Sequence, residues 1–299
     1  MSFAERFYTS KDGLRLFFRD YGPRTSVAAP VLCLPGLTRN SRDFADLARW
    51  LAETRRVICP DLRGRGRSAW DSDYRNYNPS VYIDDVIRLL ESERLSNVLI
   101  IGTSLGGLLA MIIGATQSNL VRGLIINDAG PEVDPKGLKR ISKYAGKQAP
   151  IASWEEAIAA CKRNYGDALP GLSSAEWEQF ARQTYCEDAG GIRLESDPRI
   201  GDAVREQDST PSDLWQVFAM LKDKPALVIR GANSDILSAA TLAKMIALKP
   251  DLATATVPDR GHAPLLNEPS SLAAIDAFLD RVDERESRQQ RSANKAHAI

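Results

Sequence analysis

The stretch "VLIIGTSLGGLLAMIIGA", from Val98 to Ala115, decides the fold of this chain, and it contains no charged residue. Its 18 residues reach the length at which an apolar run becomes a candidate membrane helix. The composition within the run indicates otherwise, because Val98–Ile101 is typical of a buried strand and the residues from Leu105 onward favour a helix. Four glycines interrupt the run and no basic cluster flanks it. We therefore expect a buried strand, a tight turn and a buried helix, not a membrane span.

The composition limits the classes of function that need to be considered. Of the 299 residues, 43% are hydrophobic and 26% are charged, which is typical of a globular protein that folds in water. The 39 basic and 39 acidic residues leave a formal net charge of zero. Proteins that bind nucleic acids or acidic membrane surfaces have a basic excess, so we expect neither kind of partner.

The four cysteines, Cys33, Cys59, Cys161 and Cys186, have neither a C-x-x-C motif nor the spacing of metal ligands. Cys33 and Cys59 lie in apolar runs, where a free cysteine packs like a small hydrophobic residue. No signal-peptide pattern is found at the N-terminus. We therefore expect reduced thiols, no metal site and a cytoplasmic location.

Apolar strand patterns alternate with helical patterns along most of the chain. We expect strands at Val31–Gly36 and Arg56–Asp61 and from about Asn97, Arg122, Pro225 and Leu252. Helical patterns lie at Phe44–Leu51, Val81–Glu91, Leu105–Ala115, Ala239–Leu248 and Leu272–Val282. This alternation predicts an α/β fold with a mostly parallel sheet covered by helices on both faces. The segments "RFYTS" and "LRLFFRDYG" predict an antiparallel hairpin on its edge.

The alternation stops between Pro131 and about Thr210, where no strand-like apolar run is recognisable. Two helix starts have capping-box spacing there, Ser153 with Glu156 and Ser173 with Glu176. After Glu284 the chain is polar and lacks apolar anchors, so we expect an irregular tail. The predicted division is a core of residues 1–130 and 211–283, a helical cap of residues 131–210, and a polar tail of residues 284–299.

Within the opening stretch, Gly102-Thr103-Ser104-Leu105-Gly106 matches the pattern G-x-S-x-G. The pattern alone is weak, but here a predicted strand ends at Gly102 and a predicted helix begins just after Ser104. A nucleophile elbow requires this context, and small residues on either side let strand and helix approach. The alternative is that Ser104 only caps a buried helix.

A serine hydroxyl needs a base to act as a nucleophile, and the chain contains only two histidines. His297 is the third residue from the end of the polar tail, a poor place for a preorganised site. His262 follows the last predicted strand in "PDRGHAPLLNEP", so it is the candidate base. The alternative is a surface-loop histidine without a role.

A carboxylate is expected to orient the imidazole and to stabilise its protonated form. Asp235, in "RGANSDIL", is the first choice, because it gives the chain order Ser, Asp, His with each residue after a strand. Asp128, in "IINDAGP", also follows a strand and is the second choice. Its alternative role is to stabilise a turn. Backbone N–H groups of Leu105 and Leu37 are the expected donors to an oxyanion.

Together these residues resemble the α/β-hydrolase family, and specifically its cap-bearing members, over roughly Arg6 to Val282. The segment "DLRGRGRS" at Asp61–Ser68 is similar to the family's D-x-R-G-x-G-x-S turn, and "NDAGP" is similar to the entry into its cap. "RGANSDIL" and "DRGHAPLLNEP" resemble its acid and histidine loops. One departure is Pro35-Gly36, where many relatives have His-Gly.

The resemblance implies a serine hydrolase that cleaves a small or medium carboxylic ester or lactone through an acyl-enzyme, without a cofactor. Dehalogenases and epoxide hydrolases of this fold need an aspartate where this chain has Ser104. We expect aromatic residues of the cap and of "DLWQVFAML" to line an apolar pocket. These residues are Trp154, Tyr165, Trp177, Trp215 and Phe218.

Two rival functions stay open at this point. The nearer is a carbon–carbon bond hydrolase or enol-lactonase for ring-fission products, whose substrate carboxylates would need an arginine such as Arg140, Arg163 or Arg182. The more distant is a receptor of the same fold that binds a ligand without hydrolysing it. A homodimer is also left open, although no exposed apolar stripe requires one.

Overall fold

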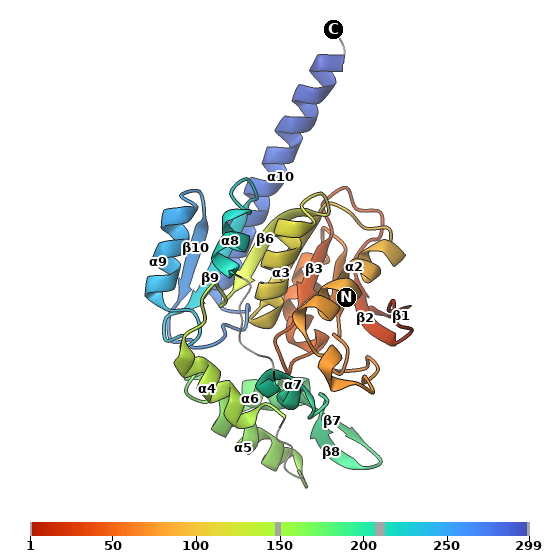
Figure 1. Ribbon diagram of the computed structural model, residues 1–299, viewed down its shortest axis with the longest axis vertical. Coiled ribbons are helices and arrows are strands. Elements are labelled where there is room, and N and C mark those ends of the chain that lie inside the picture. Colours follow the sequence, from red (N-terminus) through yellow and green to blue (C-terminus); the bar gives the residue numbers. More distant parts are fainter. Residues whose placement is uncertain (1, 147–150, 207–212, 298–299) are drawn as a thin grey trace.

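An eight-stranded sheet forms the centre of the computed structural model, which describes residues 2–146, 151–206 and 213–297 (Figure 1). The strand order is β1-β2-β4-β3-β5-β6-β9-β10. The strands are β1 (Ala4–Thr9), β2 (Arg15–Tyr21), β3 (Val31–Leu34), β4 (Val57–Pro60), β5 (Val98–Thr103), β6 (Val121–Asn127), β9 (Ala226–Gly231) and β10 (Ala253–Val257). From β4 to β10 all neighbours are parallel, and β1 and β2 form the antiparallel edge hairpin that the sequence predicts.

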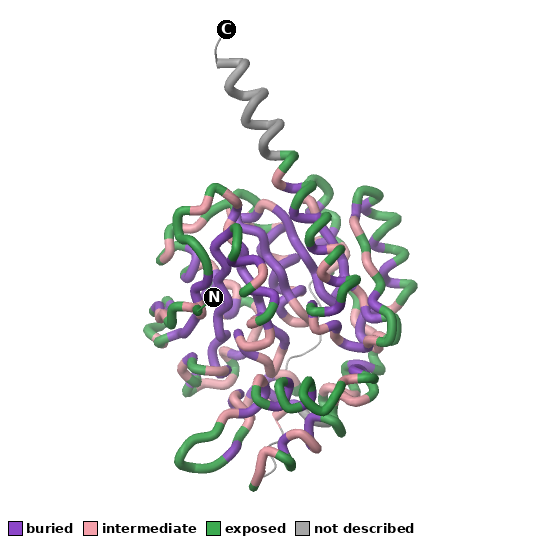
Figure 2. The backbone as a smooth tube through the Cα atoms, turned by 180° about the vertical axis from the view of Figure 1, so that it is seen from behind, coloured by how far each residue is buried: buried purple, intermediate pink, exposed green. Residues whose placement is uncertain are grey.

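Helices cover both faces of this sheet, as expected for the α/β class. One face is covered by α2 (Pro79–Ser92), α3 (Leu105–Thr116), α8 (Leu214–Ala219) and α9 (Ala239–Leu248), and the other by α1 (Ala45–Leu51) and α10 (Pro269–His297). Within β5, Val98 and Ile100 pack on the first face and Leu99 and Ile101 on the second. Burial on both faces explains why the strands read as continuous apolar runs, and Figure 2 shows the buried residues concentrated along them.

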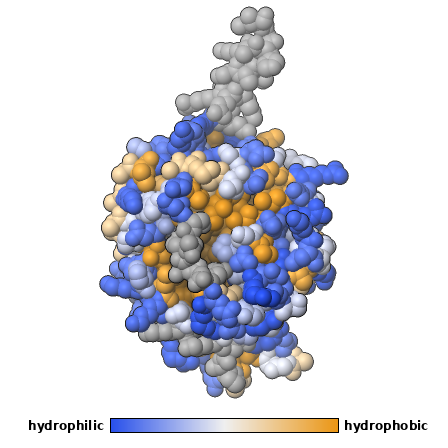
Figure 3. Space-filling view, in the orientation of Figure 1, coloured by the Kyte–Doolittle hydropathy of each residue, from blue (hydrophilic) through white to orange (hydrophobic). Residues whose placement is uncertain are grey.

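The opening stretch therefore divides into β5 and α3 with a turn between them, as predicted. None of the described helices is both long enough and apolar enough to cross a membrane. On the face drawn in Figure 3, hydrophobic residues gather near the middle, over α3, and hydrophilic residues occupy most of the margin.

Between β6 and β9 the chain leaves the sheet and forms a separate layer (Figure 1). Its elements are α4 (Pro135–Tyr144), α5 (Trp154–Tyr165), α6 (Ser174–Thr184), β7 (Tyr185–Asp188), β8 (Gly191–Leu194) and α7 (Ile200–Glu206). Ser153 and Ser173 cap α5 and α6 as expected, and Ser173 forms the full capping box with Glu176.

Two expectations about the non-core segments are wrong. The inserted layer contains the β7–β8 hairpin, whose four-residue strands are too short for a recognisable hydrophobic period. The polar tail is not irregular along its backbone, because α10 continues to His297. Residues 284–299 include three Ala, three Arg, two Glu and two Gln and lack Gly and Pro, so helix propensity favours continuation of the helix.

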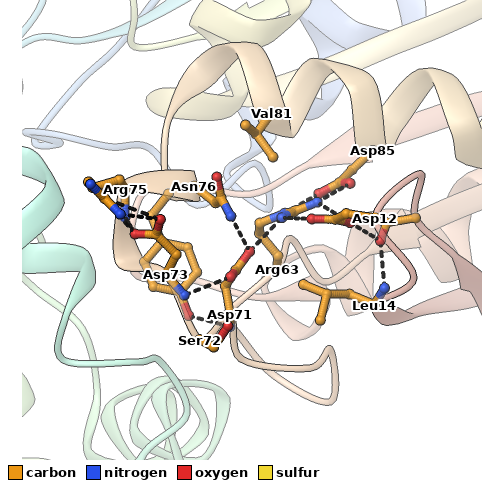
Figure 4. Close-up of polar contacts among 12 residues, drawn as sticks. Asp12, Leu14, Arg63, Asp71, Ser72, Asp73, Arg75, Asn76, Val81 and Asp85 are labelled. Carbon is orange, nitrogen blue, oxygen red and sulfur yellow. Dashed lines mark hydrogen bonds and ion pairs between the residues drawn. The ribbon is translucent and has the colours of Figure 1, made fainter.

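The turn after β4 is anchored by Arg63, a buried arginine surrounded by carboxylates (Figure 4). Its Nε and Nη2 donate to Asp85 of α2, both at 2.7 Å, and its Nη1 donates to Asp71 at 2.6 Å and to Asp12 at 2.8 Å. The hydrogen bond from Arg63 lowers the pKa of Asp12 to about 2. This network fixes the backbone of the turn to α2 and to the β1–β2 connection.

Candidate active site

Ser104 stands on a sharp turn between β5 and α3, with φ 55° and ψ −116°. Such a backbone is strained for a residue with a side chain, as a nucleophile elbow requires. A Cβ on Gly102 would overlap the carbonyl oxygen of Gly106, and a Cβ on Gly106 would overlap that of Leu34. The Ser104 side chain makes no capping hydrogen bond to α3, so the helix-cap alternative finds no support.

A substitution at Gly106 is expected to separate strand from helix. Gly106→Ala places a methyl group inside the backbone of Leu34 on β3, and no flexible side chain can give way there. We expect the free energy of unfolding to fall by about 3 kcal/mol or more. Urea unfolding followed by circular dichroism measures the loss. In the control, Gly190→Ala, the methyl group meets only a flexible Asp188 oxygen, and an equal loss there would contradict this account.

Ser104 is joined to a histidine and a carboxylate by two short hydrogen bonds. His262 Nε2 lies 2.8 Å from Ser104 Oγ, and His262 Nδ1 lies 2.8 Å from Asp128 Oδ2. His262 follows β10 and Asp128 follows β6, so each comes from the carboxyl end of a parallel strand. Asp128 is fully buried, and its carboxylate also accepts hydrogen bonds from Gly231 N (2.9 Å) and Ser234 Oγ (2.6 Å). Ser234 binds Oδ2, the oxygen that faces the imidazole, and Gly231 binds Oδ1, so both oxygens of the carboxylate are held.

The expectation that Asp235 contacts His262 is wrong. Arg140 of α4 forms a bidentate ion pair with Asp235, in which Nε lies 2.6 Å from Oδ2 and Nη2 lies 2.8 Å from Oδ1. The hydrogen bond from Arg140 also lowers the pKa of Asp235. Asp128, directly after β6, has the contact with His262 instead, and the carboxylate of Asp235 is taken up by Arg140. Of the other histidine, His297, only the helical backbone is described.

The two residues whose backbone N–H groups are expected to hold an oxyanion, Leu37 and Leu105, lie close to Ser104. Leu105 is the first residue of α3, and the first N–H groups of a helix have no acceptor within it. Leu37 belongs to the loop after β3 and lines the same cavity as Ser104. A Cβ built on Gly36 would lie 3.7 Å from Ser104 Cβ, so this loop is in close contact with the elbow. The Leu37 carbonyl accepts a hydrogen bond from Arg65 Nε at 2.8 Å.

A cavity opens at Ser104 and His262, between the sheet and the inserted layer. Its apolar lining comes from both parts: Leu37, Phe44, Leu47, Ile141, Tyr165, Leu169, Phe180, Leu265 and Leu266. Its charged lining residues are Arg39, Asp43, Asp46 and Glu176, and the imidazole of His262 also lines it. Arg39 is paired with Asp43 through Nε (2.8 Å) and Nη2 (2.5 Å). The cavity is therefore apolar along most of its wall, and carboxylates outnumber guanidinium groups in its lining.

Of the five aromatic residues expected to line the pocket, only Tyr165 does so. Trp177 is buried within the inserted layer, and Trp154 donates its Nε1–H to Glu187 at 3.0 Å. Trp215 and Phe218 lie on α8, which packs against α3 in the core. An amphipathic stripe indicates that one face of a helix is buried, but it does not tell which part of the protein covers that face. Phe180 and Leu169 were therefore not identified from the sequence as pocket residues, although both line the cavity.

No cluster of three or more His, Cys, Asp or Glu in the described parts of the chain is arranged to hold a metal ion. The four cysteines are free thiols.

Comparison with known proteins adds to this geometry. The model of the alpha/beta hydrolase family matches residues 31–275. A 3-hydroxybutyrate-oligomer hydrolase of Cupriavidus necator is 32% identical over 279 residues, which cover 89% of this chain and 92% of that protein. A 2-(acetamidomethylene)succinate hydrolase of Mesorhizobium japonicum is 29% identical, with coverage of 84% and 87%. The crystal structure of an alpha/beta hydrolase from Novosphingobium aromaticivorans is similar with a TM-score of 0.89 and 43% identity, covering 94% of this chain and 99% of that one.

Proposed function

Because this chain belongs to the alpha/beta hydrolase family, we propose that it is a serine hydrolase of small or medium carboxylic esters or lactones. The observation that carries the proposal is the continuous hydrogen-bonded set of Ser104, His262 and Asp128, of which Ser104 and His262 line the cavity. A protein that only binds its ligand has no chemical need for all three groups, which weighs against the receptor alternative.

In the proposed mechanism, Ser104 Oγ attacks the acyl carbonyl carbon while His262 Nε2 takes the hydroxyl proton. Asp128 holds the imidazole by Nδ1 and stabilises its positive charge. The N–H groups of Leu37 and Leu105 hold the negative oxygen of the tetrahedral intermediate. The intermediate collapses as the alcohol leaves with the proton from His262. A water molecule, deprotonated by His262, then attacks the acyl-enzyme and releases the carboxylic acid and Ser104.

The lining of the cavity favours an ester that is uncharged near the scissile bond. One arginine and three carboxylates line the cavity, and Arg39 is already engaged by Asp43. A substrate carboxylate held beside Ser104 would be repelled there. The relative of Cupriavidus necator is named for the hydrolysis of 3-hydroxybutyrate oligomers, so esters of short hydroxy acids are the first substrates to test.

The carbon–carbon hydrolase alternative is less well supported. The arginines expected to hold the carboxylates of such a substrate, Arg140, Arg163 and Arg182, are not among the residues that line the cavity. Arg140 is paired with Asp235, and Arg182 is paired with Glu178 on the surface of α6. The Mesorhizobium japonicum relative is named for the hydrolysis of a substituted succinate, so the test below includes a substrate that carries carboxylates.

Steady-state kinetics on four substrates tests the proposed function. The substrates are a p-nitrophenyl butyrate, the methyl ester of a 3-hydroxybutyrate dimer, a neutral lactone and a dienoate that carries carboxylates. We expect kcat/KM for the best neutral ester or lactone to exceed that for the dienoate by about 100-fold or more. The opposite ranking would overturn the assignment in favour of the carbon–carbon hydrolase. Absence of turnover on all four, with retained binding of one, would favour the receptor.

We further propose that residues 131–210 act as the cap of the site and residues 1–130 and 211–283 as its core. In support, Ile141, Tyr165, Leu169 and Phe180 of the inserted layer contribute side chains to the cavity above Ser104. Exclusion of water by such a layer strengthens the electrostatic interactions at the reacting carbonyl. The free thiols agree with a cytoplasmic location, which fractionation of the cells would test.

A further inference from the structure

The turn of residues 61–68 supports the loop that carries Leu37 at two points. Asp61 Oδ1 accepts a hydrogen bond from the N–H of Ser41 at 2.7 Å, and Arg65 Nε donates to the carbonyl of Leu37 at 2.8 Å. Both contacts lie on the C-terminal side of Gly36, the residue that approaches Ser104. The loop that begins at Pro35-Gly36 is therefore anchored at two of its backbone groups by the turn of residues 61–68.

Arg65 is fully buried, with 0% of its surface exposed. Its Nη1 donates to the Arg63 carbonyl at 2.7 Å and to Tyr82 Oη at 2.8 Å, and its guanidinium lies over the Tyr82 ring at 4.7 Å. Each of its hydrogen-bond acceptors is therefore neutral. Within the described chain, no carboxylate is paired with Arg65, and its Nη2 has no hydrogen-bond partner. Arg65 is thus a buried guanidinium with no carboxylate paired directly to it, in an environment where charge acts strongly.

The position of this guanidinium is fixed by the rigid turn that carries it. Arg63, whose carbonyl holds Arg65, is itself held by three carboxylates (Figure 4). Gly66 adopts φ +54°, and a Cβ there would overlap the carboxylate of Asp61. The backbone of the turn also pairs with the inserted layer, through Gly66 N to the Glu195 carbonyl at 2.7 Å. Arg65 is therefore placed before any substrate binds.

We propose that Arg65 is a positioning residue for the oxyanion hole, an inference that rests on the proposed function. Gly36 restrains the peptide before Leu37 only weakly, so an anchor on the Leu37 carbonyl limits the rotation that would turn its N–H away from Ser104. The positive charge of Arg65 adds an electric field that stabilises the negative oxygen of the tetrahedral intermediate. Both effects act on the transition state and leave ground-state binding of the ester nearly unchanged.

The test compares Arg65→Gln and Arg65→Lys with the wild-type enzyme on the best ester of the panel. For Arg65→Gln we expect kcat to fall about 100-fold with KM within about threefold, because loss of one oxyanion contact costs 10²–10³ in rate. The inhibition constant of a trifluoromethyl ketone, which forms a tetrahedral oxyanion adduct with Ser104, should rise by the same factor.

Arg65→Lys carries the test if Arg65→Gln fails to fold, since it keeps the charge and loses the Nε–H that reaches Leu37. We expect a loss of about 10-fold in kcat, matched by the weaker ketone inhibition. Tyr82→Phe is the matched control: it removes another hydrogen bond of the same guanidinium and should leave kcat within about twofold.

The outcomes separate this inference from the proposed function. A folded Arg65→Gln or Arg65→Lys with wild-type kcat and ketone affinity would overturn the role of Arg65, and so would a loss in kcat without a change in ketone affinity. If the wild type turns over no ester, or if Ser104→Ala is as active as the wild type, the proposed function itself fails.

Discussion

Ser104→Ala is expected to lower kcat for ester hydrolysis by about 10⁶-fold, because no other hydroxyl is bonded to His262 in the described structure. The change removes one oxygen from a partly exposed position, so the fold and KM should be nearly unaffected. A discontinuous assay of product formation by the purified variant, freed of contaminating esterases, measures the residual rate of ester hydrolysis. Ser174→Ala, at an exposed position on α6, is the control and should retain wild-type activity.

A residual rate within about tenfold of the wild type in Ser104→Ala would mean that the acyl group is never carried by this serine. Hydrolysis by a water molecule activated directly by His262 would then replace the acyl-enzyme mechanism.

Asp128→Asn is expected to lower kcat by about 10⁴-fold. An amide in place of the carboxylate presents an N–H or a neutral oxygen to Nδ1, so it no longer stabilises the imidazolium and favours the wrong tautomer of His262. The variant keeps an oxygen that can accept the hydrogen bond from Gly231 N, which limits the loss of stability. The pH profile of kcat, with the melting temperature measured in parallel, separates a catalytic loss from unfolding.

Asp235→Asn is the matched control for this prediction, because both residues follow central strands and both were candidates for the same role. Asp235 is held by Arg140, so its amide variant should reduce kcat by less than about tenfold. A larger loss in Asp235→Asn than in Asp128→Asn would restore Asp235 as the acid and contradict the geometry described here.

The contact between Ser104 and His262 was easier to predict from the sequence than the contact between His262 and Asp128, and the reason lies in what each prediction needed. Ser104 is marked by local constraints, since small residues must surround an elbow, and His262 followed by elimination between two histidines. The choice between Asp128 and Asp235 depends on which carboxylate reaches the imidazole in space and which is taken up by Arg140, 95 positions from Asp235. Such contacts are long-range, and in the sequence each aspartate simply follows a strand.

The core was more predictable than the inserted layer for a similar physical reason. Strands buried on both faces produce unbroken apolar runs, and capping boxes mark helix starts locally at Ser153 and Ser173. The aromatic stripes of α5 and α6 do not tell which part of the structure each side chain faces. Trp177 was therefore expected to line the cavity, but it is buried within the inserted layer and Phe180 lines the cavity instead. Arg65 gave no signal at all, because in sequence it is one of several arginines in "DLRGRGRS".

Labelling of the intact protein with a serine-directed fluorophosphonate, followed by peptide mapping, tests the central claim most directly. The account predicts a single adduct on the wild type, located on Ser104, with no adduct on Ser104→Ala and much slower labelling of Asp128→Asn. Absence of an adduct on the folded wild type, or an adduct on another residue that persists in Ser104→Ala, would contradict the claim that Ser104, His262 and Asp128 form an activated nucleophile.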